Sequence, residues 1–481
     1  TLESRDVSPL IAAINSVGGW PILGSASNYD LLTYNLEDYL AKVYGYLGLS
    51  IFYSISVQPD ANDTLVNRVY FDSPSFGLGR NQLIDTSAYP DIVNAYKKYI
   101  LQTALLLGAT NDSQTHNDIE KMLIFESKLA KLSTSPEDRR DAKVWYNRMT
   151  FNDFKNLTSN KVDWLQLTNR IYEALNSPIR LTAKELVIVS DIPYYKGVIQ
   201  LLERTTNRVI ANYFGWRIAM AFGSYTVEEF RNIEFQFNNV YSGVQKKSEL
   251  WKTCVTFLSS ALQYAVSRKY VEENFTTKDK EEVSLMIKYL RDSFKVLVQE
   301  SDWLDDITKN KSLEKLDAII ENNVYPDWIL DNQELDKYYN LKQSVDPKKA
   351  FEGILYLQKI SNLNVFEEIH KPVNKTLSWP MPPAIVNAAY EPTQNSITFP
   401  AGTLRPPFFD SKWPASMNFG GIGAVIGHEI THGFDDEGRQ FDKNGNLINW
   451  WSDQIFQRFN KKSNCFVNQY SSIYDADAQM N

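Results

Sequence analysis

The chain has 481 residues, of which 43% are hydrophobic and 22% charged, and its formal net charge is −8 at pH 7. This composition indicates a folded globular protein, and the length predicts two or three domains because single cores stop growing at about 250–300 residues. The acidic balance and the lack of a basic run interleaved with aromatic residues exclude nucleic acid as an expected partner. No apolar run approaches the roughly 20 residues that cross a bilayer, and the N-terminal residues are not a signal peptide. The sequence therefore predicts a soluble protein, or one whose targeting segment lies outside this chain.

Helical periodicity dominates the first three quarters of the chain. Apolar residues recur at helical spacing in four clear segments, residues 36–47, 93–107, 117–132 and 278–297. Two further segments carry helix start signals. Ser135-Pro136-Glu137 predicts an N-cap followed by proline in the first turn, and Thr226-Val227-Glu228-Glu229 predicts a capping box.

Strand-like segments are few. Residues 49–57 and 65–71 flank the turn signal at residues 60–63 and predict one hairpin. Beyond about residue 345, proline and glycine become frequent, and residues 384–390 and 396–399 predict two further strands. The sequence predicts a mainly α fold with a few short strands. We place one domain boundary near residue 350, which divides a mostly helical domain, 1–350, from a second domain, 351–481.

The most informative motif is His428-Glu429-Ile430-Thr431-His432, which uses two of the four histidines in the chain. On an α-helix, residues i and i+4 lie one turn apart on the same face, so both imidazoles can reach one metal ion. This spacing is typical of zinc peptidases, in which the glutamate acts as general base on the water that the metal activates. The motif therefore predicts His428 and His432 as Zn²⁺ ligands and Glu429 as the catalytic base.

The residues before the motif predict a helix that is held by burial. Residues 417–427 contain several glycines, each of which lowers helix propensity by roughly 1 kcal/mol, and close approach of a neighbouring backbone would explain them. Ile422, Ile426 and Ile430 form the i, i+4, i+8 stripe of a buried face. The alternative is an amphipathic core helix with two incidental histidines, which the scarcity of histidine in this chain disfavours.

A catalytic zinc site needs a third protein ligand. Asp435 and Asp436 lie three and four residues beyond His432, which suits carboxylates that orient an imidazole, but they are too close along the same helix to complete the coordination. Asp475 and Asp477 are also available, although neither lies in a convincing helix. His116 and His370 lie in polar segments, where we expect solvated side chains.

Three other patterns are less specific. Residues 442–453 resemble a calcium loop, but Gly445 is at the fourth position and Asp453 replaces the glutamate at the twelfth, so a surface turn is expected. Cys254 and Cys465 are too few for a disulfide framework and are read as buried free thiols or as cysteines with partners elsewhere. Asn-x-Ser/Thr sequons permit glycosylation without arguing for it, at Asn62, Asn111, Asn156, Asn274, Asn310 and Asn374.

Five segments around the histidine motif form a recognisable set: Val386-Asn387-Ala388-Ala389-Tyr390, Ile397-Thr398-Phe399-Pro400-Ala401-Gly402, Pro406-Pro407-Phe408-Phe409, Asn418-Phe419-Gly420-Gly421-Ile422-Gly423 and Gly433-Phe434-Asp435-Asp436. Together with the motif they resemble the neprilysin and endothelin-converting-enzyme family of zinc metallopeptidases. The resemblance is specific across residues 384–470 and has weaker echoes at residues 76–78 and 325–328.

Residue by residue, the resemblance implies the same zinc ligands and base, and it adds substrate contacts. Asn387 and Ala388 would hydrogen-bond the substrate backbone from an edge strand. Four residues would line the pocket for the side chain after the scissile bond, namely Phe408, Thr403, Ala424 and Val425. Thr403 and Ala424 are smaller than the family's apolar residues, so larger substrate side chains should be tolerated.

The resemblance also implies an architecture and a biological setting. A large helical domain would roof a thermolysin-like catalytic domain and enclose a central cavity that admits small bioactive peptides and excludes folded proteins. The third zinc ligand, a glutamate, and the disulfide partners of Cys254 and Cys465 would lie outside this chain, the glutamate beyond Asn481. The protein would be extracellular, as a secreted form or the ectodomain of a type II membrane protein, with contact to the membrane only through an anchor absent from this chain.

Two rival interpretations remain open. One is a catalytically incomplete family member that acts as a binding protein. The other is a metal-dependent hydrolase of non-peptide substrates, which would share the zinc ligands without needing the Asn387-Ala388 contacts.

Overall fold

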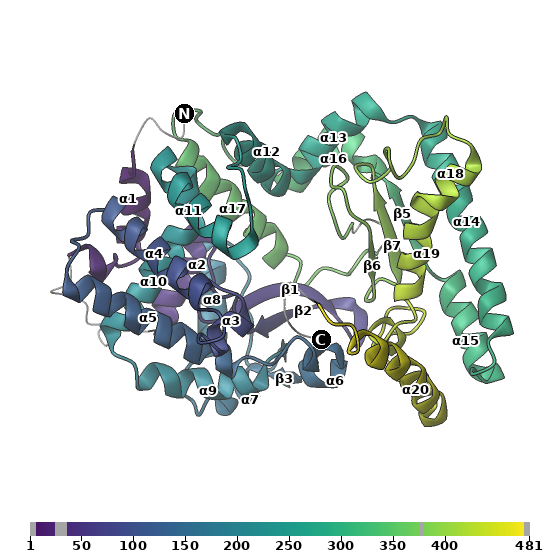
Figure 1. The fold of residues 1–481 in the computed structure, drawn as a ribbon, viewed down its shortest axis with the longest axis horizontal. Coiled ribbons are helices and arrows are strands. Elements are labelled where there is room, and N and C mark those ends of the chain that lie inside the picture. The colour runs from purple at the N-terminus through teal and green to yellow at the C-terminus, as the bar shows by residue number, and fades with distance from the viewer. Residues whose placement is uncertain (1–5, 25–35, 376, 378, 476–481) are drawn as a thin grey trace. The chain divides into compact units, whose positions relative to one another are not determined.

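The computed structural model describes residues 6–24, 36–375, 377 and 379–475 (Figure 1). Its secondary structure is mainly α-helical with a few short strands, as the sequence predicts. Two compact units are present, each of which is discontinuous along the chain. Unit 1 contains the described residues of Thr1–Gln58, Val66–Ala261 and Asp336–Pro372, and unit 2 those of Pro59–Leu65, Leu262–Leu335 and Val373–Asn481. This division differs from the single boundary expected near residue 350, because distant segments of the chain return to each unit.

Unit 1 is built mainly from helices around one four-stranded sheet. Its helices are α1 (Ser8–Ser16), α2 (Leu36–Leu47), α3 (Arg80–Ile84), α4 (Pro90–Leu106), α5 (Ser113–Leu132), α6 (Ala142–Trp145), α7 (Phe151–Leu157), α8 (Trp164–Ala174), α9 (Ile192–Glu203), α10 (Asn207–Phe222), α11 (Glu228–Ser242), α12 (Leu250–Ala261) and α17 (Ala350–Phe366). α16 (Asn332–Tyr339) spans the division at residue 335. The sheet has the order β1-β2-β4-β3 and consists of β1 (Ser54–Asp60), β2 (Asp63–Asp72), β4 (Leu186–Val189) and β3 (Arg148–Thr150).

The predicted hairpin is confirmed with shifted bounds. β1 and β2 flank a turn at Ala61 and Asn62, and the residues around this turn are counted with unit 2. β2 pairs with β4 in parallel, with Tyr70 opposite Ile188. Residues 49–53, which were expected to begin the first strand, lie before β1.

The predicted helices of unit 1 are confirmed as α2, α4 and α5, whose apolar faces pack into one core rich in aromatic residues. Of the two predicted helix start signals, the N-cap at Ser135 forms and the capping box at Thr226 does not. At Ser135 the hydroxyl accepts from the N–H of Asp138, but only a short 3₁₀ helix follows, η5 (Asp138–Arg140). The capping box at Thr226 is wrong, because its buried hydroxyl donates to the carbonyl of Gly223 and α11 begins only at Glu228.

Unit 2 combines helices with a three-stranded sheet. Its helices are α13 (Gln263–Asn274), α14 (Thr277–Glu300), α15 (Asp306–Asp317), α18 (Ala415–Gly420), α19 (Ile422–His432) and α20 (Asp453–Tyr470). The sheet has the order β5-β7-β6 and consists of β5 (Ile320–Val324), β7 (Ser396–Pro400) and β6 (Ala389–Glu391). β5 and β7 are parallel, β6 and β7 are antiparallel, and β6 is an edge strand.

The long helix α14 confirms the helix predicted at residues 278–297. It begins at a capping box in which the Thr276 hydroxyl accepts from the N–H of Asp279 and the Asp279 carboxylate accepts from the N–H of Thr276. Its buried face packs against α19, and Figure 1 shows the two helices beside each other.

One of the two later strand predictions is wrong in extent. β7 matches the strand predicted at residues 396–399, whereas the strand predicted at 384–390 is limited to β6. Residues 383–386 form a turn and bend, in which the N–H of Ile385 donates to the carbonyl of Pro382. The extended pairing with β7 therefore begins only at Ala389.

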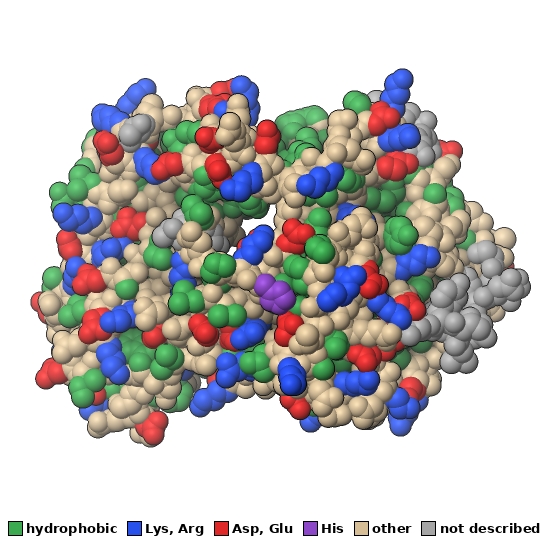
Figure 2. Space-filling view, turned by 180° about the vertical axis from the view of Figure 1, so that it is seen from behind, with side chains coloured by type: hydrophobic (Ala, Val, Ile, Leu, Met, Phe, Trp, Pro, Cys, Tyr) green, Lys and Arg blue, Asp and Glu red, His purple; other side chains and the backbone are tan. Residues whose placement is uncertain are grey.

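No helix among the described residues is both long enough and apolar enough to cross a membrane. On the face drawn in Figure 2, acidic and basic side chains are interspersed rather than gathered by sign.

Candidate active site

The histidine motif forms the C-terminal part of α19, which is separated from α18 by a break at Gly421 (φ −88°, ψ −97°). Close packing requires glycine at this break. The N–H of Ile422 donates to the carbonyl of Phe408 at 2.8 Å, and a Cβ at Gly421 would lie 2.4 Å from the same oxygen. Gly420 and Gly427 have no atom within 4 Å of such a Cβ, so the close approach expected along this glycine-rich segment occurs at Gly421.

The buried stripe predicted for this helix is confirmed. Ile422, Ile426 and Ile430 are each 0% exposed and face the interior of unit 2, where α19 packs on α14 and β6. Burial of this face, rather than helix propensity, holds a glycine-containing helix in place.

His428 and His432 project from the other side of α19. Their Nε2 atoms lie 2.9 Å apart, and their rings are nearly perpendicular, at 86°. A tetrahedral zinc ion with Zn–N bonds of about 2.0–2.1 Å separates two ligand nitrogens by roughly 3.3 Å, so a side-chain shift of a few tenths of an ångström would admit the metal. The donor set therefore fits zinc as two of its three protein ligands. No cluster of three or more His, Cys, Asp or Glu side chains suited to a metal occurs among residues 6–24, 36–375, 377 and 379–475.

Asp435 orients one of these histidines. Its Oδ2 atom lies 2.7 Å from Nδ1 of His432, and its Oδ1 accepts the N–H of Glu437 at 2.9 Å and that of Gly438 at 2.7 Å. This contact favours the tautomer in which Nδ1 of His432 carries the proton and Nε2 keeps its lone pair. Asp435 was expected on the same helix as the histidines, but α19 ends at His432 and the aspartate lies in the segment that folds back over that end.

The neighbouring Asp436 is placed differently. Its backbone carbonyl accepts from the side-chain amide of Gln440 at 2.9 Å. Of the two predicted aspartates, the structure brings Asp435 to His432.

Glu429 lies between the two histidines in sequence and is 5% exposed. Burial raises the pKa of its carboxyl, and the opposing influences are the charges of His432 and His428 and a hydrogen bond from the backbone N–H of Tyr390. Because that N–H belongs to β6, the edge strand and the carboxylate are directly linked.

The backbone before β6 is fixed by Thr403. The Thr403 hydroxyl accepts from the N–H of Asn387 at 2.7 Å and donates to the carbonyl of the same residue. Thr403 is 3% exposed, and its hydroxyl is bonded to the backbone of Asn387. The resemblance placed Thr403 in the wall of the pocket. Asn387 itself is exposed, and its side-chain oxygen accepts from the N–H of Ala388 at 3.0 Å.

The other predicted pocket residues lie at the start of α19. Ala424 is exposed and Val425 half-buried, and both precede His428 by the three or four residues that put side chains on one helix face. Phe408 is half-buried and reaches the same end of the helix through its carbonyl bond to Ile422.

The two other histidines lie away from the motif. His116 and His370 are exposed, as expected, and the Nε2 of His370 lies 3.3 Å from Glu185.

The expectation of two buried thiols is wrong for Cys465, which is exposed on α20, while Cys254 is half-buried. Asp475 is exposed and Asp477 lies outside the described residues. Five sequon asparagines are exposed and Asn274 is half-buried.

The segment that resembles a calcium loop is a turn, as expected. Oδ1 of Asp442 accepts the N–H groups of Asn444 and Asn446, and Gly445 adopts φ +79°. The ammonium of Lys375 donates to the carbonyls of Asn444 and Thr393, so a lysine supplies positive charge beside this turn.

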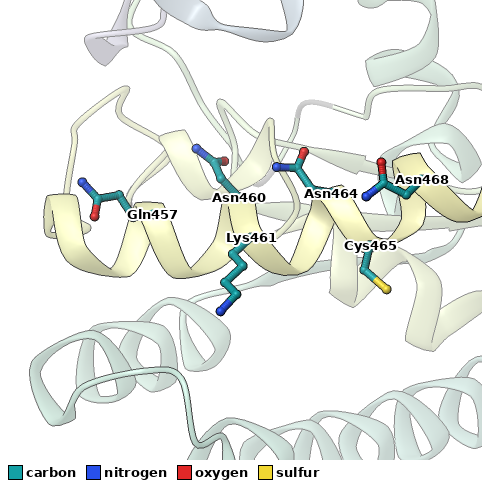
Figure 3. A pocket seen from close by; sticks show the side chains of 6 residues that line it. All are labelled: Gln457, Asn460, Lys461, Asn464, Cys465 and Asn468. Carbon is teal, nitrogen blue, oxygen red and sulfur yellow. The ribbon is translucent and has the colours of Figure 1, made fainter.

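A groove of about 650 Å³ runs along α20 and belongs to no predicted site (Figure 3). The side chains that line it all come from this one helix: Gln457, Asn460, Lys461, Asn464, Cys465 and Asn468.

Sequence reasoning missed three contributors to the site. The backbone N–H of Tyr390 and the ammonium of Lys315 act through contacts that sequence spacing does not reveal. The third contributor, Asn395, is 0% exposed and connects these two residues through other atoms. Its side-chain oxygen accepts from the Tyr390 hydroxyl, and its amide donates to the Lys315 carbonyl. The strand pattern of residues 396–399 was the nearest signal for this region.

Sequence models of peptidase family M13 match this chain over residues 1–326 and again over residues 387–481. The chain belongs to peptidase family M13. The second match contains the whole histidine motif and the edge strand, so the M13 resemblance and the geometry of α19 concern the same residues.

Curated relatives extend this M13 assignment over almost the whole chain. The chain is 36% identical to neprilysin-1 of Trittame loki, across 99% of this chain and 66% of that protein. It is 31% identical to endothelin-converting enzyme 1 of Cavia porcellus, across 98% of this chain and 61% of that protein. The chain thus spans less than two thirds of the length of these relatives.

Solved structures share the fold. The zinc metalloprotease Zmp1 of Mycobacterium tuberculosis, in complex with an inhibitor, matches 99% of this chain and 68% of its own with a TM-score of 0.86 and 24% identity. PepO of Lactobacillus rhamnosis HN001 matches 98% of this chain and 74% of its own with a TM-score of 0.79 and 22% identity.

Proposed function

We propose that the protein containing this chain is a zinc-dependent endopeptidase that cleaves oligopeptides on the amino side of hydrophobic residues. One observation carries the proposal. On α19, the Nε2 atoms of His428 and His432 converge to 2.9 Å, and the carboxyl of Glu429 belongs to the same turn of helix. Family membership supports this reading, because two relatives are named neprilysin-1 and endothelin-converting enzyme 1.

His428 and His432 would hold the zinc ion through their Nε2 atoms, with a further ligand supplied from outside the described residues. When bound, zinc would supply a Lewis acid that polarises the scissile carbonyl and lowers the pKa of a water molecule. The chain's own contribution is orientation, since Asp435 keeps the proton of His432 on Nδ1.

Glu429 would act as the proton carrier. Its carboxylate takes a proton from the attacking water and delivers it to the leaving amine. The hydrogen bond from the N–H of Tyr390 fixes this carboxylate against β6, so the proton carrier and the edge of the sheet keep one geometry.

The edge strand β6 would bind the peptide backbone as an added strand. The N–H of Tyr390 donates to Glu429, and the edge strand would be continued toward the substrate by the preceding residue, Ala388. Thr403 holds the backbone of Asn387 in place beside it. A non-peptide hydrolase would have no use for this arrangement, which favours a peptide substrate.

The preference for a hydrophobic side chain after the scissile bond rests on the residues near His428. Val425 and Ala424 lie on the histidine face of α19, and Phe408 adjoins the start of that helix. The small side chain of Ala424 leaves room for larger substrate residues. We also propose an extracellular setting, which rests on the resemblance to the neprilysin and endothelin-converting-enzyme family and which the sequons permit.

The proposal is tested on the complete protein with a set of quenched fluorescent peptides that differ in the residue after the scissile bond. Zinc-dependent cleavage before Phe or Leu, abolished by a chelator and restored by Zn²⁺, is expected. Zinc binding without cleavage would instead identify a catalytically incomplete binding protein, and cleavage confined to non-peptide esters would identify the other hydrolase class.

A further inference from the structure

Lys315 on α15 is a buried cation whose hydrogen bonds all go to one segment. Lys315 is 1% exposed. The ammonium donates to the backbone carbonyls of Gly433, Gly438 and Phe441, each at 2.7 Å. An ammonium has three N–H groups, so every donor is used on the segment that follows the histidine motif.

Aromatic rings surround the same ammonium. Its Nζ lies 5.7 Å from the ring centroid of Tyr390, 5.6 Å from that of Phe434 and 5.9 Å from that of Trp450. Desolvation lowers the pKa of this lysine to about 7, while the charges of Asp442 and Asp435 act in the opposite direction. A buried cation costs free energy unless it is compensated. Here the three carbonyls and the three aromatic rings compensate the charge, and we call them together the carbonyl cradle.

The segment held in this way carries Asp435. Gly433 and Gly438 lie on either side of the aspartate in sequence, and their carbonyls meet at the one ammonium. The segment also packs tightly on the end of α19, because a Cβ at Gly438 would lie 1.9 Å from the carbonyl oxygen of His432. The ammonium therefore closes a loop whose apex bears the carboxylate bonded to His432.

We propose that Lys315 is a positioning residue for the metal site, which fixes the Gly433–Phe441 segment so that Asp435 holds Nδ1 of His432 and leaves Nε2 directed at the metal. This inference rests on the proposed zinc function. It adds a residue whose ammonium binds the backbone of the loop and through that backbone acts on the metal ligand His432.

The physical reason is the number of carbonyls that depend on one side chain. Removing the ammonium takes from the buried Gly433 carbonyl the donor that the structure gives it. The carbonyls of Gly438 and Phe441 each lose one of two donors, because they also accept from the N–H of Phe441 and the indole N–H of Trp450. The Gly433 carbonyl can recover a partner only if the loop moves. Such movement loosens the Asp435–His432 contact, and loss of a partner that orients a histidine ligand typically weakens metal binding by roughly 10–100-fold.

The test measures zinc affinity by chelator competition in the complete protein, well below its unfolding temperature. Lys315→Met keeps the side-chain length without donors, and Lys443→Met is the matched control, because Lys443 pairs at the surface with Glu314 on the same helix α15. We expect a loss of about 10–100-fold for Lys315→Met and less than twofold for Lys443→Met. Unchanged zinc affinity of Lys315→Met would overturn the inference.

A double-mutant cycle separates positioning from general destabilisation. If Lys315 acts through Asp435, zinc affinity of the Lys315→Met/Asp435→Asn protein should be no weaker than that of the weaker single variant. Fully additive losses would overturn the inference. In the metal-free protein, nitrogen NMR of His432 should show the Nδ1-protonated form in the wild type and a mixture of tautomers in Lys315→Met.

A second variant covers the case in which Lys315→Met fails to fold. If Lys315→Met does not fold, Lys315→Gln, which keeps two donors, should fold and lose zinc affinity to a smaller degree. If neither variant folds, Lys315 is a folding determinant and the positioning role is rejected. If the wild type binds no zinc, it is the proposed function that fails.

Discussion

The hydroxyl of Thr403 is hydrogen-bonded to both backbone groups of Asn387, sixteen residues earlier in the chain. One side chain thus fixes the two peptide groups that flank Asn387, just before the edge strand β6. Because this is the part of the sheet proposed to bind substrate, Thr403 should influence peptide binding without contacting the peptide.

Thr403→Val should weaken substrate binding. Valine has nearly the same shape but neither donates nor accepts, and loss of two hydrogen bonds of about 1 kcal/mol each would free the Asn387 backbone. We expect a rise in KM of about tenfold with a smaller change in kcat, measured with a peptide cleaved by the wild type. Thr403→Ser keeps the hydroxyl and should restore KM; an unaltered KM in the valine variant would exclude this role.

Glu429→Gln should abolish hydrolysis while zinc is retained. Glutamine fills the same space but cannot accept the proton, so kcat should fall by about 10²–10⁴-fold. Zinc content by atomic absorption and steady-state kinetics on the same preparation check both parts. The exposed Glu281 of α14 provides the control Glu281→Gln, which should behave as wild type, and substantial turnover by Glu429→Gln would refute the assignment of the base.

Asp435→Asn and Asp436→Asn should differ although the residues are adjacent. The carboxylate of Asp435 is hydrogen-bonded to His432, whereas the backbone carbonyl of Asp436 accepts from Gln440. An amide accepts the bond to His432 more weakly than a carboxylate does. Zinc affinity should fall by about 10–100-fold for Asp435→Asn and by less than threefold for Asp436→Asn. Equal effects of the two variants, measured by chelator competition, would contradict the orienting role of Asp435.

The stability that Lys315 confers should depend on pH. Its pKa is lowered to about 7 in the folded protein, whereas an unfolded lysine titrates near about 10.4. Between these values the unfolded chain binds more protons, so stability rises with pH, by at most about 1.4 kcal/mol per pH unit. Below pH 7 both states are protonated and this gain is absent.

The measurement is urea unfolding of the wild type and of Lys315→Met at pH 6.5, 8 and 9.5. The difference in unfolding free energy between the two proteins should shift in favour of the wild type as pH rises. A difference that stays constant across this range would mean that the carbonyl cradle keeps the lysine protonated throughout.

Much of the fold could be predicted because local patterns and burial agree. α2, α5 and α14 carry apolar stripes that fill one side of a helix, and each forms where its periodicity predicts. The spacing of Ile422, Ile426 and Ile430 likewise indicates the buried face of α19, and all three are 0% exposed. The histidine motif could be recognised because its chemistry depends on a spacing within one helix.

Other features depend on contacts that no local pattern contains. Thr226 has the sequence of a capping residue, but its buried hydroxyl binds the carbonyl of Gly223 instead. Residues 384–388 have strand-like composition, yet the chain turns there, with the N–H of Ile385 bonded to the carbonyl of Pro382. Lys315 reads as one more charged residue of a surface helix, and only the folded chain brings it to carbonyls more than a hundred residues away.

The interleaving of the two units has a consequence for synthesis on the ribosome. Unit 1 is completed by α17, which packs against α2, and Tyr44 of α2 lies against Phe366 of α17 with ring centroids 5.5 Å apart. At about 5–20 residues per second, the nascent chain waits roughly 15–60 s between emergence of these two helices. Throughout that interval the apolar face of α2 that receives α17 lacks its cover, so this face is where chaperones should bind the growing chain.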